Sequence, residues 1–210
     1  MPKTEPFDQH YEQYESWFNR NRFAYKSELR AVERLIPPGA RGVEIGMGSG
    51  KFAFPLGIMV GVEPSPSMRS LASARGLEVY EGVAEKLPFQ DQEFNFALMV
   101  TTICFVDDAD ASFSEAYRVL KPNGRFIIGL VDKESPLGSV YETHKASNVF
   151  YQDAVFYSAR EVLDLLSAHG FAEHEVVQTV FGNLSEINSV QEPRPGYGEG
   201  GFIVVSAVKK

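Results

Sequence analysis

Short runs of apolar residues alternate with helix-like patterns through the middle of the chain. The runs end at glycine, proline or charged residues and have the length of buried strands. We expect strands over residues 41–46, 58–62, 77–82, 94–100 and 124–131. Helices fit residues 51–56, 66–75 and 109–120 between them. This alternation predicts an α/β fold, a doubly wound parallel sheet with helices on both faces.

The two ends of the chain follow different patterns. Residues 7–36 have the periodicity of one or two helices rich in aromatic residues, and a Pro-Pro-Gly sequence ends them. Ser158 and Glu161 have the spacing of a capping box, which predicts that an amphipathic helix starts there. Residues 171–181 and 201–208 have the pattern of strands. We expect one domain with four parts: an N-terminal helical cap (1–39), a core (40–131), a mixed segment (132–157) and a C-terminal helix with a strand pair (158–210).

Three glycines on alternate positions follow the first expected strand and are the most specific signal in the chain. They are Gly46, Gly48 and Gly50. Glycine lets a turn bring its backbone close to a ligand. The dinucleotide fingerprint would need glycine in place of Lys51, and a P-loop would need serine or threonine in place of Phe52. Glu44 precedes the turn and opposes a phosphate, whereas it suits the ammonium and sulfonium groups of S-adenosylmethionine (SAM).

A second acidic residue, Glu63, ends the next expected strand and precedes Pro64. In a doubly wound sheet, an acid at this position can accept hydrogen bonds from both hydroxyls of a ribose. NAD sites use the same device, so Glu63 alone leaves the identity of the ligand open. Together with Glu44 and the glycine spacing, it favours SAM.

Two further segments carry a family resemblance. Residues 82–89 (Gly-Val-Ala-Glu-Lys-Leu-Pro-Phe) follow the third expected strand, and residues 115–126 lead into the fifth. With the glycine turn, these segments span residues from about 40 to 131, and here the chain resembles the class I SAM-dependent methyltransferases of the small, UbiE-like type 11 group. The resemblance implies a Rossmann-like, seven-stranded sheet in the order 3-2-1-4-5-7-6 with strand 7 antiparallel. It also implies SAM as the cofactor and methyl transfer as the activity.

The resemblance implies roles for individual residues. In this group, the backbone at the position of Ala84 lies beside the adenine ring, and the tyrosine at the position of Tyr14 folds over the methionine end of the cofactor. The group often has aspartate where Val83 stands, so adenine recognition here should depend on backbone groups and packing. We expect the cofactor-binding residues to be Glu44, Gly46, Gly48, Gly50, Glu63, Pro64, Ala84, Glu85, Thr101 and Tyr14.

Segment 132–157 stands where this group builds a lid over the methyl acceptor. Aromatic residues of this lid and of the N-terminal helices can form a semi-apolar pocket for a small molecule. Asp132 directly follows the fifth expected strand and is a candidate for proton transfer. Tyr141 and His144 are further candidates, three residues apart on an expected helix and therefore on one face of it. All three fit a structural or solvated role as well.

We expect transfer of the SAM methyl group to a small-molecule acceptor. The alternatives are a SAM-binding protein without transferase activity, a protein-directed methyltransferase and a nucleotide-dependent oxidoreductase. Lys51 and Glu44 oppose the oxidoreductase, because they depart from the phosphate motifs. The sequence identifies neither the acceptor nor the atom that receives the methyl group.

The composition indicates the class of protein, its partners and its compartment. The 210 residues are 44% hydrophobic and 23% charged, as in soluble globular proteins, and a net charge of −8 argues against a nucleic-acid partner. One cysteine fits a reducing compartment. The first residues lack the apolar core of a signal peptide, and the apolar runs are too short to span a bilayer. We expect a cytoplasmic monomer or homodimer that binds neither membrane nor nucleic acid and uses no metal.

Overall fold

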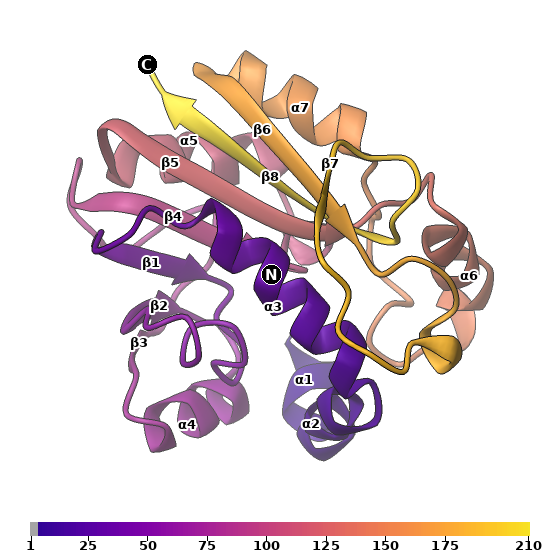
Figure 1. The fold of residues 1–210 in the computed structure, drawn as a ribbon. Coiled ribbons are helices and arrows are strands. Elements are labelled where there is room, and N and C mark those ends of the chain that lie inside the picture. Colours follow the sequence, from indigo (N-terminus) through magenta and orange to yellow (C-terminus); the bar gives the residue numbers. More distant parts are fainter. Residues whose placement is uncertain (1–3) are drawn as a thin grey trace.

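The computed structural model describes residues 4–210. Met1, Pro2 and Lys3 lie outside the described residues, and with them the start of the segment in which the sequence shows no signal-peptide core. The described residues form an eight-stranded sheet flanked by helices, in the order β3-β2-β1-β4-β5-β8-β6-β7 (Figure 1). The strands are β1 (Gly42–Ile45), β2 (Val60–Val62), β3 (Glu78–Tyr80), β4 (Phe94–Val100), β5 (Leu120–Val131), β6 (Phe171–Thr179), β7 (Arg194–Pro195) and β8 (Phe202–Lys209).

The strand directions confirm the expected Rossmann-like topology. Strands β1 to β5 are parallel to one another. Strand β8 is antiparallel to both of its neighbours, β5 and β6. With β6 and β8 as the sixth and seventh strands, the order is the expected 3-2-1-4-5-7-6. The structure adds one strand to the expected seven, because the two-residue β7 pairs with β6 at the edge of the sheet.

Alternate side chains of β4 enter two hydrophobic clusters on opposite faces of the sheet. Ala97 and Met99 pack in one cluster with residues of helices α5 (Ala109–Val119) and α7 (Ala159–Ala168). Leu98 and Val100 pack in the other with residues of helix α3 (Arg22–Leu35). Figure 1 shows α3 on the near face of the sheet and α5 and α7 behind it. A strand buried on both faces explains the continuous apolar run that the sequence shows here.

The remaining helices are short. They are α1 (Glu5–Gln9), α2 (Tyr11–Arg20), α4 (Pro66–Ala74), α6 (Pro136–His144) and the 3-10 turns Ile103–Phe105, Lys145–Ser147 and Leu184–Glu186. The helix expected over residues 51–56 is wrong: this segment forms successive turns. Pro55 lacks an N–H donor and disfavours the helical conformation of Phe54, and Gly57 follows with φ of +70°. The capping box at Ser158 and Glu161 is confirmed by reciprocal hydrogen bonds at the start of α7.

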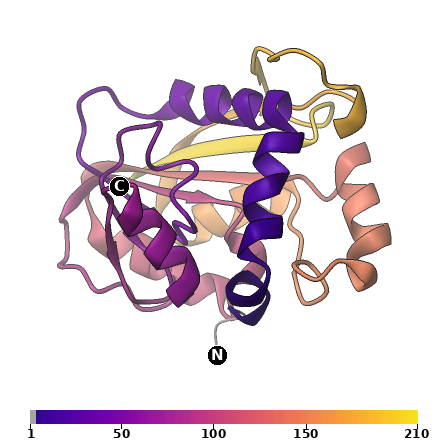
Figure 2. The ribbon, with the colours of Figure 1, turned by 90° about the horizontal axis from the view of Figure 1, so that it is seen from below.

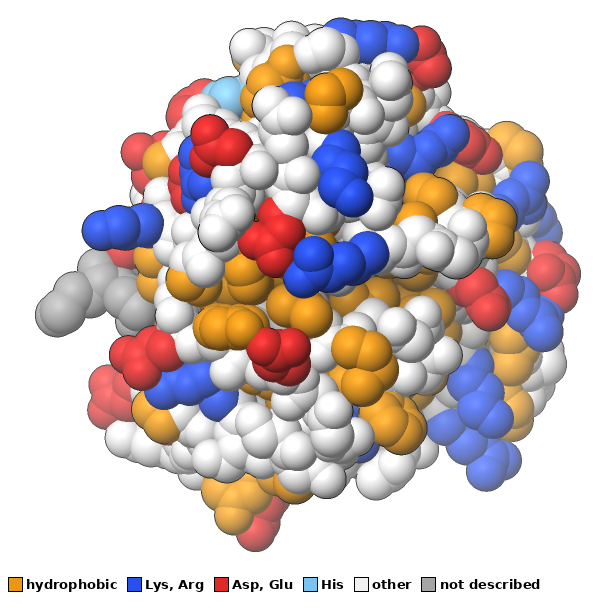
Figure 3. All heavy atoms as spheres, turned by 90° about the vertical axis from the view of Figure 1, so that its left-hand side faces the viewer, with side chains coloured by type: hydrophobic (Ala, Val, Ile, Leu, Met, Phe, Trp, Pro, Cys, Tyr) orange, Lys and Arg blue, Asp and Glu red, His pale blue; other side chains and the backbone are white. Residues whose placement is uncertain are grey.

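The carboxyl ends of β1, β2 and β4 face the N-terminal helices and the segment that contains α6. Figure 2 shows α2 alongside this end of the sheet and α6 beyond it. This is the edge where ligands of open α/β sheets bind. On the face drawn in Figure 3, Lys and Arg side chains are interspersed with Asp and Glu around a band of hydrophobic side chains. Among residues 4–210, no helix combines the length and apolarity needed to cross a membrane.

Candidate active site

The glycine turn leaves β1 in a conformation that side chains disfavour. The φ angles are +70°, +57° and +81° for Gly46, Gly48 and Gly50. A Cβ at Gly46 would overlap the side chain of Thr102, and one at Gly48 would lie 3.0 Å from the hydroxyl of Tyr14. Gly48 therefore leaves a space in front of Tyr14 that a side chain would fill. Both Gly46 and Gly48 line a cavity at the end of the sheet.

Glu63 follows β2 and lies in the wall of the same cavity. Its Oε2 accepts a hydrogen bond from the N–H of Gly48, and its Oε1 accepts one from the N–H of Ser65, both at 2.8 Å. The side chain is 7% exposed. Burial raises the pKa of Glu63, and the two N–H donors oppose that shift. Glu63 thus fixes the glycine turn while it faces the space in front of the turn.

Glu44 lies in β1, two residues before the turn, and is 2% exposed. It is not part of the cavity wall, and one of its oxygens accepts a hydrogen bond from the N–H of Ala53. The other oxygen, Oε2, has no hydrogen-bond partner among the described residues. Burial raises the pKa of Glu44 well above its usual range, and the charge of Glu63 adds to the effect. A buried, unpartnered carboxylate oxygen is costly unless a donor or cation completes it.

The segments after β3 and β4 complete this side of the cavity. Ala84 is buried in the wall, and Pro64 and Glu85 also line it. Glu85 accepts hydrogen bonds from the backbone N–H groups of Asp107 at 2.7 Å and Asp108 at 3.2 Å, which ties the two segments together. Thr101 lines the cavity directly after β4, with φ of +48°. That φ is unusual for a residue with a branched side chain and turns the chain sharply at the strand end.

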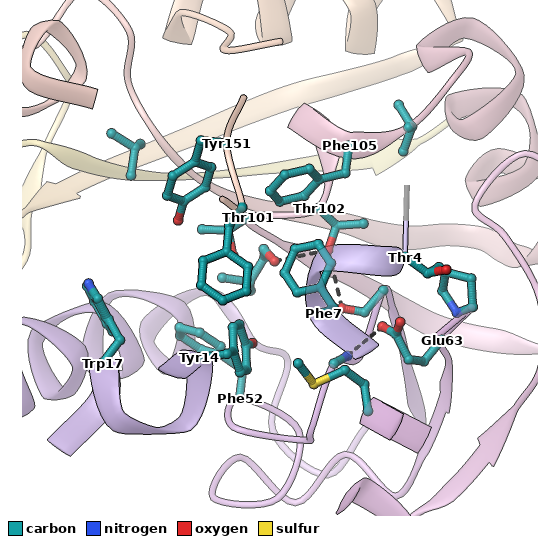
Figure 4. Close-up of a pocket in the computed structure, with 18 of the residues that line it drawn as sticks. Thr4, Phe7, Tyr14, Trp17, Phe52, Glu63, Thr101, Thr102, Phe105 and Tyr151 are labelled. Atoms are coloured by element: carbon teal, nitrogen blue, oxygen red, sulfur yellow. Dashed lines mark hydrogen bonds between the residues drawn. The ribbon is translucent and has the colours of Figure 1, made fainter. Parts of the chain in front are cut away.

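Tyr14 reaches the cavity from α2. Its hydroxyl lies near Gly48, and its ring packs edge-on against Phe7 and Phe18. Burial raises the pKa of the Tyr14 phenol, and the negative charge of Glu63 raises it further. In Figure 4, Tyr14 and Phe7 lie between Glu63 on one side and Trp17 on the other.

The cavity has a volume of about 590 Å³, within the usual range for small-molecule sites. One end is formed by the residues of the glycine turn, Glu63 and the segments after β3 and β4. The other end is rich in aromatic side chains from the N-terminal helices and segment 132–157. These are Trp17, Phe18, Tyr141, Phe150 and Tyr151, with Phe7 and Tyr14 between the two ends (Figure 4). The structure thus brings together the two aromatic sets that the sequence singled out.

The structure separates the three candidates for proton transfer. Tyr141 lines the cavity, where burial raises the pKa of its phenol. Asp132 is buried away from the cavity wall and accepts hydrogen bonds from the N–H groups of Glu134 at 3.1 Å and Ala159 at 3.4 Å. It therefore joins the end of β5 to the start of α7. His144 is exposed at the end of α6 and does not share the cavity with Tyr141.

Sequence reasoning missed Glu28, which lines the cavity from α3 and is 6% exposed. Burial raises the pKa of Glu28 to about 8. The sequence holds a signal for it, because Glu28 lies on the helix stripe of Ala24, Ala31 and Val32, which are all buried. A carboxylate on an apolar stripe is rare unless it is paired or used by a ligand.

Comparisons with known proteins agree with this geometry. Residues 43–128 match the family model described as "Methyltransferase domain". A solved structure from Thermotoga maritima, described as a SAM-dependent methyltransferase and possible histamine N-methyltransferase, is 51% identical, covers 99% of this chain and 100% of its own, and has a TM-score of 0.96. An uncharacterized protein of Methanocaldococcus jannaschii is 44% identical over 97% of this chain and 98% of its own. The ubiquinone/menaquinone biosynthesis C-methyltransferase UbiE of Brucella anthropi is 34% identical over 43% of this chain and 40% of its own.

The chain belongs to the class I SAM-dependent methyltransferases, as the fold, the family model and the Thermotoga structure together show. SAM is the cofactor of this class. The residues present fit it: the unpartnered Oε2 of Glu44 suits a cationic group, and the backbone at Gly48 leaves a space that a Cβ would fill.

Proposed function

We propose that this protein transfers the methyl group of SAM to a small organic acceptor that binds at the aromatic end of the cavity. One observation carries the proposal. A single cavity runs from Gly48 and Glu63 to Trp17 and Tyr151, so a cofactor at one end would face a second ligand at the other (Figure 4). An in-line displacement requires that the cofactor and the acceptor face each other within one site.

We assign the cofactor end by chemistry. Glu63 would accept hydrogen bonds from the ribose hydroxyls, since each of its oxygens keeps a lone pair beyond its backbone bond. Glu44 lies outside the cavity wall and would attract the ammonium group by its charge rather than by direct contact. Ala84 and Glu85 would border the adenine, with Pro64 and Thr101 completing the wall. When bound, SAM supplies a methyl group activated by the sulfonium charge.

The protein's own part in the reaction is alignment and exclusion of water. Tyr14 would cover the methionine end of the cofactor from α2, and segment 132–157 would act as a lid over the acceptor. We assign no proton transfer to Asp132 or His144, because neither lines the cavity. Tyr141 is the candidate that reaches it, and its raised pKa keeps the phenol protonated and able to donate a hydrogen bond.

The aromatic lining supports a small organic acceptor rather than an extended polymer. Since the Thermotoga relative is described as a possible histamine N-methyltransferase, amines are the first acceptors to test. A screen with methyl-labelled SAM against small amines, thiols, phenols and carboxylates measures transfer directly. Label in one of these acceptors supports the proposal, whereas label only in added protein substrates contradicts it.

Titration with S-adenosylhomocysteine (SAH) and, separately, with NADH distinguishes the cofactor classes. We expect SAH to bind to the purified protein and NADH not to bind. Binding of SAH without transfer to any acceptor would favour the alternative of a SAM-binding protein without transferase activity. Binding of NADH without SAH would overturn the proposed function as a whole.

A further inference from the structure

The carboxylate of Glu28 stands unpaired beside the acceptor end of the cavity. Within residues 4–210, no hydrogen-bond donor or cation is paired with it. Glu28 is fixed on α3 between Ala24, Ala31 and Val32, so its backbone position is set by the core. Yet the side chain lines the cavity. An unpaired carboxylate that is nine-tenths buried is expensive unless it is neutral or meets a ligand.

The groups that face Glu28 come from several elements. The phenols of Tyr141 on α6, Tyr151 in the following loop and Tyr25 on α3 all lie within reach of its charge, and burial raises the pKa of each of them. These phenols therefore stay neutral at physiological pH. Arg20 also lines the cavity but forms no ion pair with Glu28. No described side chain thus supplies the positive charge that would balance this carboxylate.

The neighbours of Glu28 suit an organic cation. The indole of Trp17 lies close enough to the hydroxyl of Tyr141 to influence its pKa, and both side chains line the cavity. Tyr151 packs against Tyr141 with ring centroids 5.1 Å apart. Aromatic faces attract ammonium groups, and a desolvated setting strengthens that attraction. Glu28 and these three aromatic side chains together offer a negative charge and aromatic faces, which are the two features that best bind a protonated amine.

Among the phenols that line the cavity, Glu28 and Glu63 act on different ones. The phenol of Tyr14 lies within reach of the charges of Glu63 and Glu44. The phenols of Tyr141 and Tyr151 lie within reach of the charge of Glu28. The cavity therefore has a carboxylate at each end, and the one at Glu28 is left for the second ligand.

We propose that Glu28 is the anionic anchor for a protonated amine on the methyl acceptor. The acceptor class is then a basic amine with an apolar or aromatic body, and neutral or acidic analogues of similar shape should bind more weakly. This inference rests on the proposed function, since it concerns the acceptor of the same site. The preference has a physical cause: a neutral ligand offers Glu28 no partner charge, and an anion keeps its carboxyl protonated, so neither forms the ion pair that an ammonium group makes.

Three probes of one shape test the anchor: 2-phenylethylamine, 2-phenylethanol and 3-phenylpropanoate, with histamine as a second amine. Each is titrated by calorimetry into protein saturated with SAH. We expect both amines to bind at least about tenfold more tightly than the alcohol, and the carboxylate not to bind. Failure of both amines to bind, or equal affinity for the alcohol, overturns the proposal.

Glu28→Gln keeps the shape of the side chain and removes its charge. We expect it to weaken amine binding at least about tenfold and to change SAH affinity less than about twofold. Glu33→Gln is the matched control, because Glu33 is exposed on the same helix, and it should change neither affinity. Equal amine affinity in Glu28→Gln and wild type contradicts the anchor. Failure of the wild-type protein to bind SAH would instead contradict the proposed function.

Proton linkage gives an independent readout. At pH 7 most of the Glu28 carboxyl is protonated in the free protein, since its pKa is about 8. Pairing with an ammonium group favours the carboxylate, so amine binding should release close to one proton. Calorimetry in two buffers of different ionisation enthalpy measures this number. Glu28→Gln should release none, and a wild-type protein that releases none overturns the proposal.

Discussion

The backbone N–H of Gly48 donates a 2.8 Å hydrogen bond to Oε2 of Glu63, which joins the glycine turn after β1 to the end of β2. The other carboxylate oxygen is fixed by the N–H of Ser65. Both contacts hold the carboxylate in one orientation at the cavity wall. A side chain positioned in this way can accept further hydrogen bonds from a ligand with little loss of conformational entropy.

Glu63→Ala should weaken SAH binding by about thirtyfold or more. The substitution removes a charge-assisted acceptor for the ribose and also releases the glycine turn. Titration calorimetry with SAH measures the effect. Glu81→Ala is the control, since Glu81 is an exposed acid after β3 that pairs with Arg69 outside the cavity. An unchanged SAH affinity in Glu63→Ala would remove Glu63 from the site.

Glu44→Gln should weaken SAH binding by about tenfold, because the unpartnered oxygen loses its charge toward the ligand's ammonium group. The sharper test uses 5′-methylthioadenosine, which has the same nucleoside but no amino-acid portion. Its affinity should change little in the same variant. An equal loss for both ligands would show that Glu44 acts by shaping the turn and not by attracting charge.

Gly48→Ala should abolish most SAH binding, because the added Cβ would fill the space in front of Tyr14. The variant also carries backbone strain, since φ at this position is +57°. Gly57→Ala separates the two effects: its φ is +70°, but its Cβ would meet no atom within 4 Å. Both variants should lose about 1–2 kcal/mol of stability, measured by urea unfolding. If Gly48→Ala binds SAH as well as Gly57→Ala does, the turn does not approach the cofactor.

The sequence predicted the parts of the fold that depend on local chemistry. Alternating apolar runs predicted the strands, and the spacing of Gly46, Gly48 and Gly50 predicted a turn that needs positive φ angles. Cofactor-binding residues were predicted at the strand ends, because the carboxyl ends of parallel strands meet at one edge of the sheet. The topology of the last strands came from the family resemblance alone. The short strand β7 was not predicted, because its two residues show no strand pattern.

Features that depend on long-range packing were beyond sequence reasoning. Asp132 follows β5 as expected, but the N–H groups of Glu134 and Ala159 draw its carboxylate away from the cavity. His144 and Tyr141 share a helix, yet only Tyr141 meets the cavity, since nothing in the helix period says where the cavity lies. Glu28 belongs to the acceptor end only because α3 packs across the sheet. These placements required the three-dimensional structure.

The raised pKa of Glu28 predicts a characteristic dependence of stability on pH. In the folded protein the carboxyl ionises near pH 8, whereas in the unfolded chain it ionises near its ordinary value of 4.5. Between these values the folded state binds more protons, so the contribution of Glu28 to the free energy of unfolding falls as pH rises and levels off above about 8. Ligand-free protein should therefore bear this cost at neutral and alkaline pH.

Glu28→Gln removes the cost and should become more stable than wild type as pH rises. We expect the difference in free energy of unfolding to grow by on the order of 2–4 kcal/mol between pH 5 and pH 9. Urea unfolding of both proteins across this range measures it, and other buried acids such as Glu44 cancel in the difference. Glu33→Gln should give a curve parallel to wild type. A parallel curve for Glu28→Gln as well would mean that Glu28 ionises as easily in the folded protein as in the unfolded chain, and that its carboxylate needs no cationic partner.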